Sequence, residues 1–186
     1  MKKGRKKMAN NVLLVSKELE LIKSTGFWEY IIIPLALVSI ITFLIGLERQ
    51  NIGKSAGISP HVLIGVSAAV IAIIQRYLWI DGGMLQDNQR LIAQVLPGIG
   101  FIGAGVIMKG DKTIVGLTTA ATIWTCAVIG LVVGSGYIII GGLFGIGVLL
   151  FIYMRDIKRG INPFKQHVHY DFGDTDVDED ERRRHA

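Results

Sequence analysis

The sequence predicts an all-α membrane protein, a polytopic bundle of five transmembrane helices. The first observation is composition: hydrophobic residues make up 51% of the 186 residues, and the mean hydropathy is +0.47. The second is the distribution of charge. Charged residues are 19% of the chain but gather at its two ends and in short breaks, leaving long apolar runs between them. Charge segregated in this way around runs of about 18 residues or more is typical of membrane spans.

The chain opens with a basic N-terminal segment, residues 1–29, which has five basic residues among its first seven. Its apolar part is interrupted by charged residues, so a short interfacial helix is expected rather than a signal peptide. Trp28 and Tyr30 are aromatic residues typical of a membrane boundary. A basic cluster beside apolar spans favours membrane lipids, with their anionic headgroups, as its partner, and we expect no nucleic acid.

Five apolar runs follow within residues 30–154. The first, Tyr30–Leu47, has 18 residues without a formal charge, about 27 Å of helix and roughly the thickness of the hydrocarbon core. Pro34 falls in its first turns, where a missing N–H costs least. The other four expected spans are His61–Ile80, Leu91–Met108, Ile114–Val133 and Tyr137–Met154.

Residues 155–186 form a polar tail whose end, DTDVDEDERRR, is typical of a disordered segment. The predicted organisation is therefore a basic N-terminal segment over 1–29, a transmembrane domain over 30–154 and this tail. Five crossings place the two basic flanks on opposite sides of the membrane, which leaves orientation weakly specified. The uncharged turn at 134–136 slightly favours a cytoplasmic C-terminus.

Glycines mark the third run, at Gly98, Gly100, Gly103 and Gly105. They match the dinucleotide fingerprint G-x-G-x-x-G, but that motif needs a preceding strand and an acidic residue about 20 positions later. Pro97 precedes the glycines, and residues 117–125 contain no acid. We interpret the glycines as helix-packing positions, where bare backbone lets a neighbour approach closely. A second interpretation stays open, in which Pro97 and the glycines break the helix and form an ion site.

Polar side chains in or beside the runs are the candidate ligand- or partner-binding residues. Glu48 and Arg49 end the first run; they either set the depth of the helix as an interfacial pair, or Glu48 faces the bundle, where ionisable residues are usually functional. Arg90 and Gln94 are four residues apart and share a helical face. Gln94 needs a partner in the membrane, and we expect Arg90 to pair with Glu48 across the bundle.

Hydroxyl side chains mark the fourth run, at Thr118, Thr119, Thr122 and Thr125. Those at positions 118, 122 and 125 recur with helical spacing, so they either bond their own i−4 carbonyls or form a polar lining facing the third run. Trp124 lies in the middle of this run, and we expect its indole N–H to find an acceptor inside the bundle.

No residue pattern in the sequence is typical of catalysis. Paired carboxylates, a Ser/His/Asp set and a CxxC motif are all missing, and the single Cys126 lies inside an apolar run. His167 and His169 are ligand types for a metal, but two ligands in a polar tail assign none. We therefore expect a non-enzymatic protein without a cofactor, and the sequence identifies no metal.

Three passages together resemble the MgtC/SapB family of bacterial membrane proteins. They are GLERQ (46–50) with its following loop, RLIAQVLPGIGFIGAGVIMKG (90–110) and GLTTAATIWTCAVIGLVVGSG (116–136). The resemblance covers roughly residues 30–154 and implies a multi-pass protein of the bacterial plasma membrane, associated with survival under magnesium limitation. The residues on family motif positions are Glu48, Arg49, Arg90, Gln94, the glycines of 98–105, Thr118, Thr119 and Trp124.

The chain also departs from the family in two places. The stretch leading into the second run, residues 56–61, lacks the basic residue usual there, and Lys54 earlier in the loop is the position to which its contact could have moved. Residues 155–186 are too short for the soluble C-terminal domain of longer members. The resemblance is therefore to the short, SapB-like branch.

Two functions remain in view. The first is a non-enzymatic membrane factor in magnesium-linked homeostasis or stress adaptation that binds another membrane protein or self-associates. It is favoured because a Mg²⁺ pathway needs several anionic oxygen ligands, and only Glu48 lies near the bilayer. The alternative is a Mg²⁺ or proton transporter or channel, which rests on Pro97, the glycines and the threonines.

Overall fold

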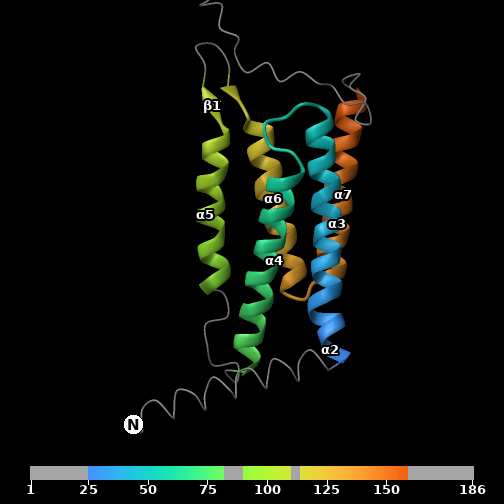
Figure 1. The fold of residues 1–186 in the computed structure, drawn as a ribbon, viewed down its shortest axis with the longest axis vertical. Coiled ribbons are helices and arrows are strands. Elements are labelled where there is room, and N and C mark those ends of the chain that lie inside the picture. The colour runs from blue at the N-terminus through green and yellow to red at the C-terminus, as the bar shows by residue number, and fades with distance from the viewer. Residues whose placement is uncertain (1–24, 82–89, 110–113, 159–186) are drawn as a thin grey trace, which may run out of the picture.

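The computed structural model describes residues 25–81, 90–109 and 114–158, which form a bundle of long helices lying side by side (Figure 1). Three helical segments join end to end at the start: α2 (Thr25–Phe27), the π-helix η1 (Trp28–Ile32) and α3 (Ile33–Asn51). The remaining helices are α4 (Ile58–Asp81), α5 (Arg90–Val106), α6 (Leu117–Gly134) and α7 (Ile138–Lys158). A small antiparallel hairpin, β1 (Met108–Lys109) and β2 (Ile114–Val115), joins α5 to α6.

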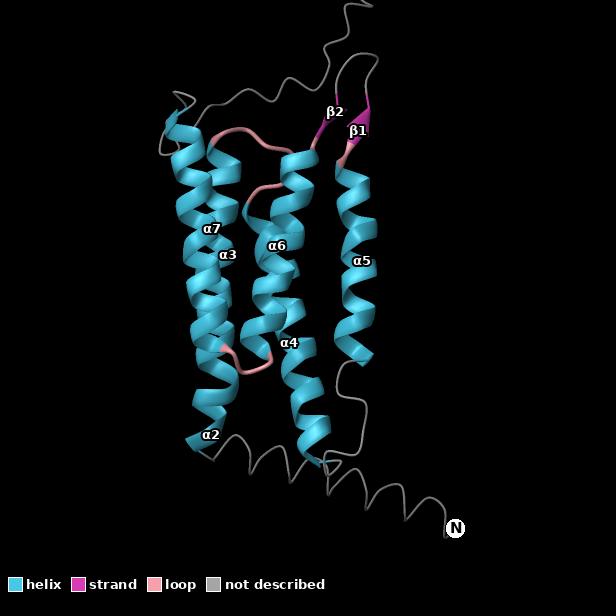
Figure 2. Cartoon of the chain, turned by 180° about the vertical axis from the view of Figure 1, so that it is seen from behind, coloured by secondary structure: helices cyan, strands magenta, loops and turns pink. Residues whose placement is uncertain are grey.

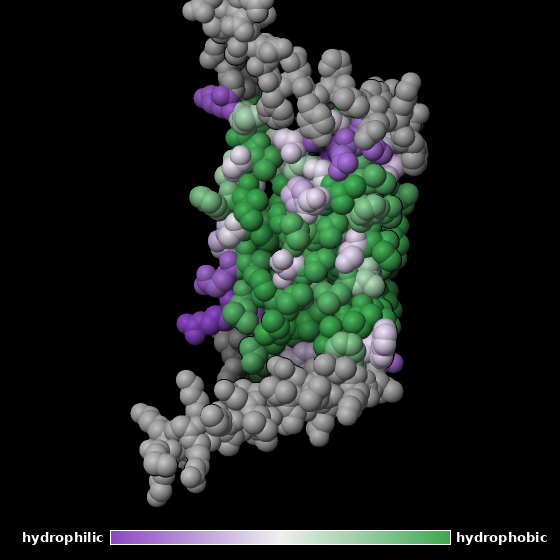
Figure 3. Space-filling model, viewed as in Figure 1, coloured by the Kyte–Doolittle hydropathy of each residue, from purple (hydrophilic) through white to green (hydrophobic). Residues whose placement is uncertain are grey.

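The predicted all-α architecture is confirmed, apart from this hairpin of two strands with two residues each. Four helices are long and apolar enough to cross a membrane, namely those within Trp28–Asn51, Ile58–Leu78, Leu117–Gly134 and Ile138–Lys158. The fifth, α5, is apolar but has 17 residues. The visible side of the bundle is mostly hydrophobic along its length (Figure 3). The chain is therefore a multi-pass membrane protein by its apolar helices.

The chain is already helical at Thr25, the first described residue, and not only from Tyr30 as predicted. Pro34 therefore lies well inside helical backbone and not in the first turns, and it has no N–H to bond the carbonyl of Tyr30 four residues earlier. The turn before Pro34 is a π-helix, an arrangement that often accommodates such an interruption. Arg76 of α4 supplies a donor to this carbonyl, since its Nη2 donates to the Tyr30 oxygen at 3.1 Å.

Small residues bring α4 and α6 into close contact. A Cβ at Gly130 would collide with the carbonyl oxygen of Gly65, and a Cβ at Gly134 would lie 2.9 Å from the Cα of Ala69. The two helices therefore pack backbone against backbone through a small-xxx-small pattern on each. A buried apolar core continues from this contact toward α3 and α7, formed by Val38, Ile41, Ile45, Ala69, Cys126, Ile129, Val133 and Ile152.

The last helix extends past the predicted end of the fifth run. It continues to Lys158, so Arg155 and Asp156, which the sequence assigned to the polar tail, belong to the bundle. The described chain begins at one end of the bundle, with α2, and α7 finishes at the other (Figure 1). The expected interfacial helix before residue 25 and the tail with His167 and His169 lie outside the described residues.

Candidate functional site

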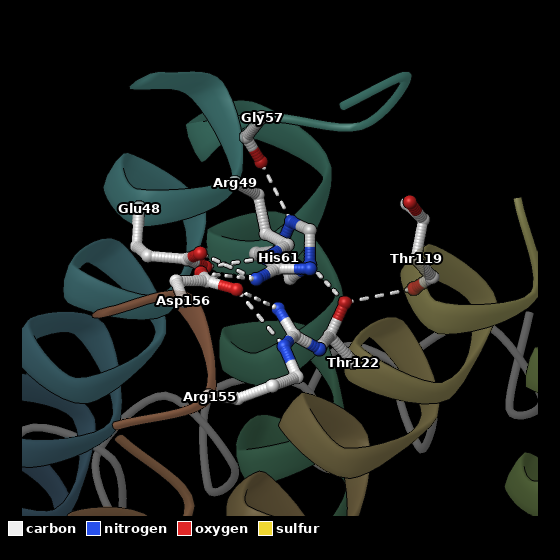
Figure 4. Close-up of polar contacts among 8 residues, drawn as sticks. All are labelled: Glu48, Arg49, Gly57, His61, Thr119, Thr122, Arg155 and Asp156. Carbon is white, nitrogen blue, oxygen red and sulfur yellow. Dashed lines mark hydrogen bonds and ion pairs between the residues drawn. The ribbon is translucent and has the colours of Figure 1, made fainter. Parts of the chain in front are cut away.

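The end of α3 carries two fully buried charges, Glu48 and Arg49, each 0% exposed. The Arg49 guanidinium donates from Nε and Nη2 to the two carboxylate oxygens of Glu48. Its Nη2 also donates to Oδ2 of Asp156 on α7, at 3.2 Å (Figure 4). One guanidinium therefore lies between carboxylates of two helices and ties the end of α3 to the end of α7.

Arg155 completes this group, which we call the charge cluster: Glu48, Arg49, Arg155 and Asp156. Its Nε and Nη2 donate to Oδ1 of Asp156 at 2.9 and 2.8 Å. Two cations and two carboxylates give a formal charge of zero, and compensation of this kind is what allows ions to be buried. The Nη1 of Arg49 is the buried donor that, among the described side chains, has no hydrogen-bond partner.

A histidine on α4 lies next to the charge cluster and links α4 to α6 (Figure 4). His61 is 0% exposed, and its Nδ1 lies 2.7 Å from the carbonyl oxygen of Gly57, so Nδ1 carries a proton and donates it. Its Nε2 lies 3.0 Å from Oγ1 of Thr122, and that hydroxyl lies 2.8 Å from the carbonyl oxygen of Thr119. The Thr122 hydroxyl has one proton, so with neutral His61 it donates to Nε2, and with charged His61 it donates to the Thr119 carbonyl.

The GLERQ passage positions these groups through its other residues. At Gly46 a Cβ would lie 2.6 Å from the Cα of Ile58, so the glycine permits α4 to begin against α3. The Oε1 of Gln50 accepts a hydrogen bond from the N–H of Ile58 at 3.4 Å, which satisfies one free donor at the start of α4. The same short passage thus sets the α3–α4 approach and supplies both Glu48 and Arg49.

Arg90 and Gln94 lie far from this cluster. Both side chains are exposed on α5, which begins at the end of the bundle where α3 begins, whereas Glu48 is near the opposite end of α3 (Figure 1). The expected pairing of Arg90 with Glu48 is therefore wrong. Helical spacing shows which residues share a face. How far along the bundle each of these residues lies depends on the direction in which its helix crosses.

The hydroxyl residues of α6 divide between its two sides. Thr118 is exposed and Thr119 is buried. Thr125 donates to the carbonyl of Ala121 at 2.8 Å, the i−4 bond that is the simpler of the two interpretations. Trp124 is 47% exposed and faces outward, so the expectation of an indole inside the bundle is wrong.

Fewer of the α5 glycines contact a neighbouring helix than the sequence suggests. A Cβ at Gly103 would lie 3.7 Å from the Cβ of Ala120, but at Gly98, Gly100 and Gly105 a Cβ would meet nothing within 4 Å. Among these four positions, contact inside the described bundle is therefore limited to Gly103. The helix is continuous through Pro97, so no break forms there.

The uncovered side of α5 forms a second candidate site, which we call the α5 outer face. Its exposed members are Arg90, Gln94, Pro97, Gly98, Phe101 and Gly105. Phe101 is 84% exposed, and the helix lies at the edge of the bundle, packed mainly against α6 (Figure 2). Pro97 also removes the donor that would bond the carbonyl of Ala93. This face therefore presents an amide, a freed carbonyl and bare backbone in a membrane helix.

Sequence reasoning missed His61, Asp156 and Gln75. His61 opens the second run and Asp156 follows the fifth, so both looked like boundary residues. Gln75 is 6% exposed, and its Oε1 accepts a hydrogen bond from the N–H of Ile92 at 2.9 Å, which fixes the start of α5. A polar residue near the end of an apolar run was the available signal in each case. The described residues contain no group of three or more His, Cys, Asp or Glu side chains that could hold a metal ion.

A sequence profile of the MgtC family matches residues 35–159, which include the charge cluster and the α5 outer face. The chain belongs to the MgtC family. Its relatives are bacterial. It is 50% identical over 109 residues to an Escherichia coli K12 protein named "Putative magnesium transporter YhiD", covering 56% of this chain and 51% of that protein.

Two further MgtC-family relatives are more distant. Protein SapB of Bacillus subtilis is 38% identical over 116 residues, which cover 58% of this chain and 48% of SapB. Protein MgtC of Brucella abortus is 39% identical over 95 residues, which cover 51% of this chain and 38% of that protein. The aligned part thus spans about half or less of the length of these relatives. No solved structure matches the chain.

Proposed function

We propose that this MgtC-family chain is a non-enzymatic factor of the bacterial plasma membrane that acts in magnesium-linked homeostasis by binding another membrane protein. The observation that carries the proposal is the α5 outer face, where Gln94 is exposed on the same helix as Gly98 and Gly105, two glycines at which a Cβ would meet nothing within 4 Å. In this proposal α5 is a fifth span, shorter than the others, and the face is the binding surface.

The chemistry of the α5 outer face supports a protein partner rather than lipid tails. The Gln94 amide has two donors and an acceptor, and hydrocarbon offers partners to none of them. The carbonyl of Ala93 has lost its helical donor to Pro97, and backbone groups in lipid need other partners. Gly98 and Gly105 leave bare surface on which a second helix can lie closely. A neighbouring transmembrane helix satisfies all three requirements together.

The test places a photoreactive benzoylphenylalanine at Phe101 and, as a matched control, at Phe151. Both are exposed aromatic residues, on α5 and α7 respectively, with 84% and 64% of their surface open. Irradiation of cells followed by mass spectrometry should give a protein adduct from position 101 and lipid adducts from position 151. An adduct with a second copy would identify self-association, whereas lipid adducts alone at both positions would contradict the proposal.

A second candidate function is ion transport, favoured by the burial of the charge cluster in apolar helices, where ionisable residues usually have a function. The name of the E. coli relative points the same way. Against Mg²⁺ stands the pairing of both carboxylates with guanidinium groups, which a cation would have to displace. Reconstituted protein should therefore show no Mg²⁺ or proton flux in liposomes. Robust flux that is abolished in Glu48→Gln would replace the first proposal with this one.

A further inference from the structure

Arg76 is a positioned cation at the end of the bundle opposite the charge cluster. It lies near the end of the apolar stretch Ile58–Leu78 of α4, at the level of a membrane boundary. Its guanidinium carbon is 5.0 Å from the ring centroid of Tyr30 and 5.8 Å from that of Tyr77. Both distances are within the range of cation–π attraction. Two aromatic rings therefore hold the guanidinium in one place.

The backbone fixes Arg76 further. Its Nη2 donates to the Tyr30 carbonyl, the oxygen whose i+4 donor is missing because residue 34 is proline. A Cβ at Gly136, whose φ is +102°, would lie 2.8 Å from Nη1, so the α6–α7 turn passes directly beside the guanidinium. Parts of three elements thus determine where this side chain lies.

Arg76 differs from Arg49 and Arg155 in the groups that surround its positive charge. The ion pairs among the described residues lie in the charge cluster, where Arg49 and Arg155 contact carboxylates. Arg76 instead contacts a carbonyl and aromatic rings, and no carboxylate in the described part of the chain pairs with its formal charge of +1. A guanidinium has five N–H donors, and one of them accounts for the bond to Tyr30. A cation near the hydrocarbon boundary is stabilised by an anion at that depth.

Anionic phospholipids supply such an anion at headgroup level on both sides of a bacterial membrane. Exposed aromatic residues lie at this end of the bundle, as expected at headgroup level. They are Trp28, Tyr30 and Tyr137, which are 62%, 49% and 62% exposed. A planar guanidinium presents paired donors that match phosphate oxygens. We propose that Arg76, held between Tyr30 and Tyr77, binds the phosphate of an anionic phospholipid.

The site does not depend on the proposed function, because the α5 outer face is on another helix. The test uses native mass spectrometry of the full chain with phosphatidylglycerol, phosphatidylcholine or inorganic phosphate. Wild-type protein should retain phosphatidylglycerol in preference to phosphatidylcholine. Arg76→Gln, which keeps a donor for the Tyr30 carbonyl but loses the charge, should weaken retention about fivefold, the equivalent of roughly 1 kcal/mol per basic residue near a lipid surface.

Two further variants test whether lipid binding depends on the position of Arg76 or only on the total positive charge of the protein. Arg76→Lys keeps the charge and should bind with intermediate affinity, and melting curves of both Arg76 variants check that they remain folded. Arg90→Gln removes an exposed basic residue at the same end of the bundle and should leave retention unchanged. Equal retention by wild type and Arg76→Gln, equal loss in Arg90→Gln, or no preference over phosphatidylcholine would overturn the proposal. Displacement of the lipid by inorganic phosphate would assign the site to free phosphate and also overturn it.

Discussion

Replacing Arg49 with methionine should be among the most damaging single changes in this protein. It removes the guanidinium that contacts both Glu48 and Asp156 and changes the formal charge of the cluster from 0 to −1. Glu48 is 0% exposed and Asp156 is 1% exposed, so water does not replace the lost partner. Removing one partner of a buried ion pair typically costs about 3–5 kcal/mol. At about 2–4 °C per kcal/mol for a chain of this size, the melting temperature should fall by roughly 6–20 °C.

A double variant tests whether this loss comes from charge or from packing. Adding Glu48→Gln to Arg49→Met leaves Arg155 and Asp156, which contact each other at 2.8 Å and sum to zero charge. The double variant should therefore recover most of the stability that Arg49→Met loses. Lys158→Met is the matched control, because it removes an exposed cation from the end of α7 and should change stability by about 0.5 kcal/mol or less.

The assay is thermal unfolding of purified protein in one detergent, followed by intrinsic fluorescence and by recovery of the monodisperse peak in size-exclusion chromatography. A melting temperature for Arg49→Met within about 2 °C of wild type, the shift expected of roughly 1 kcal/mol or less, would show that the cluster does not stabilise the bundle. A double variant no more stable than Arg49→Met would show that the guanidinium acts through its packing and not through its charge.

Three further outcomes are expected. Gly134→Leu should prevent α6 from packing on the backbone of α4, so that no folded protein is seen on size-exclusion chromatography. Gly100→Leu is the control and should fold normally in detergent, because a Cβ at Gly100 meets nothing within 4 Å. Equal yields of the two variants would contradict the packing argument. Gln75→Leu should lower stability by about 1 kcal/mol, measured by the same thermal unfolding, because the N–H of Ile92 loses its acceptor. Cys126 is 0% exposed, so a maleimide should label it after denaturation and not in the native protein.

Apolar runs, and hence helices, could be predicted from the sequence because lipid requires each span to satisfy its own backbone. Periodicity also placed Arg90 and Gln94 correctly on one face of α5. Periodicity could not show how deep in the bundle these residues lie, since the distance from Arg90 to Glu48 depends on which end of the bundle each helix starts from. The same limit explains Trp124, whose central position along α6 does not determine whether its ring faces protein or lipid.

Contacts between distant segments were decided by the tertiary structure alone. Asp156 joins Arg49 across 107 positions of chain, and Arg76 meets the Tyr30 carbonyl across 46. The sequence determined that Pro34 would offer no N–H and that Glu48 and Arg49 would end an apolar run, because these follow from covalent structure and from the order of the residues. Which side chain then forms a hydrogen bond or ion pair with each of these polar groups depends on how the helices pack. That packing depends on the surfaces of all the helices together.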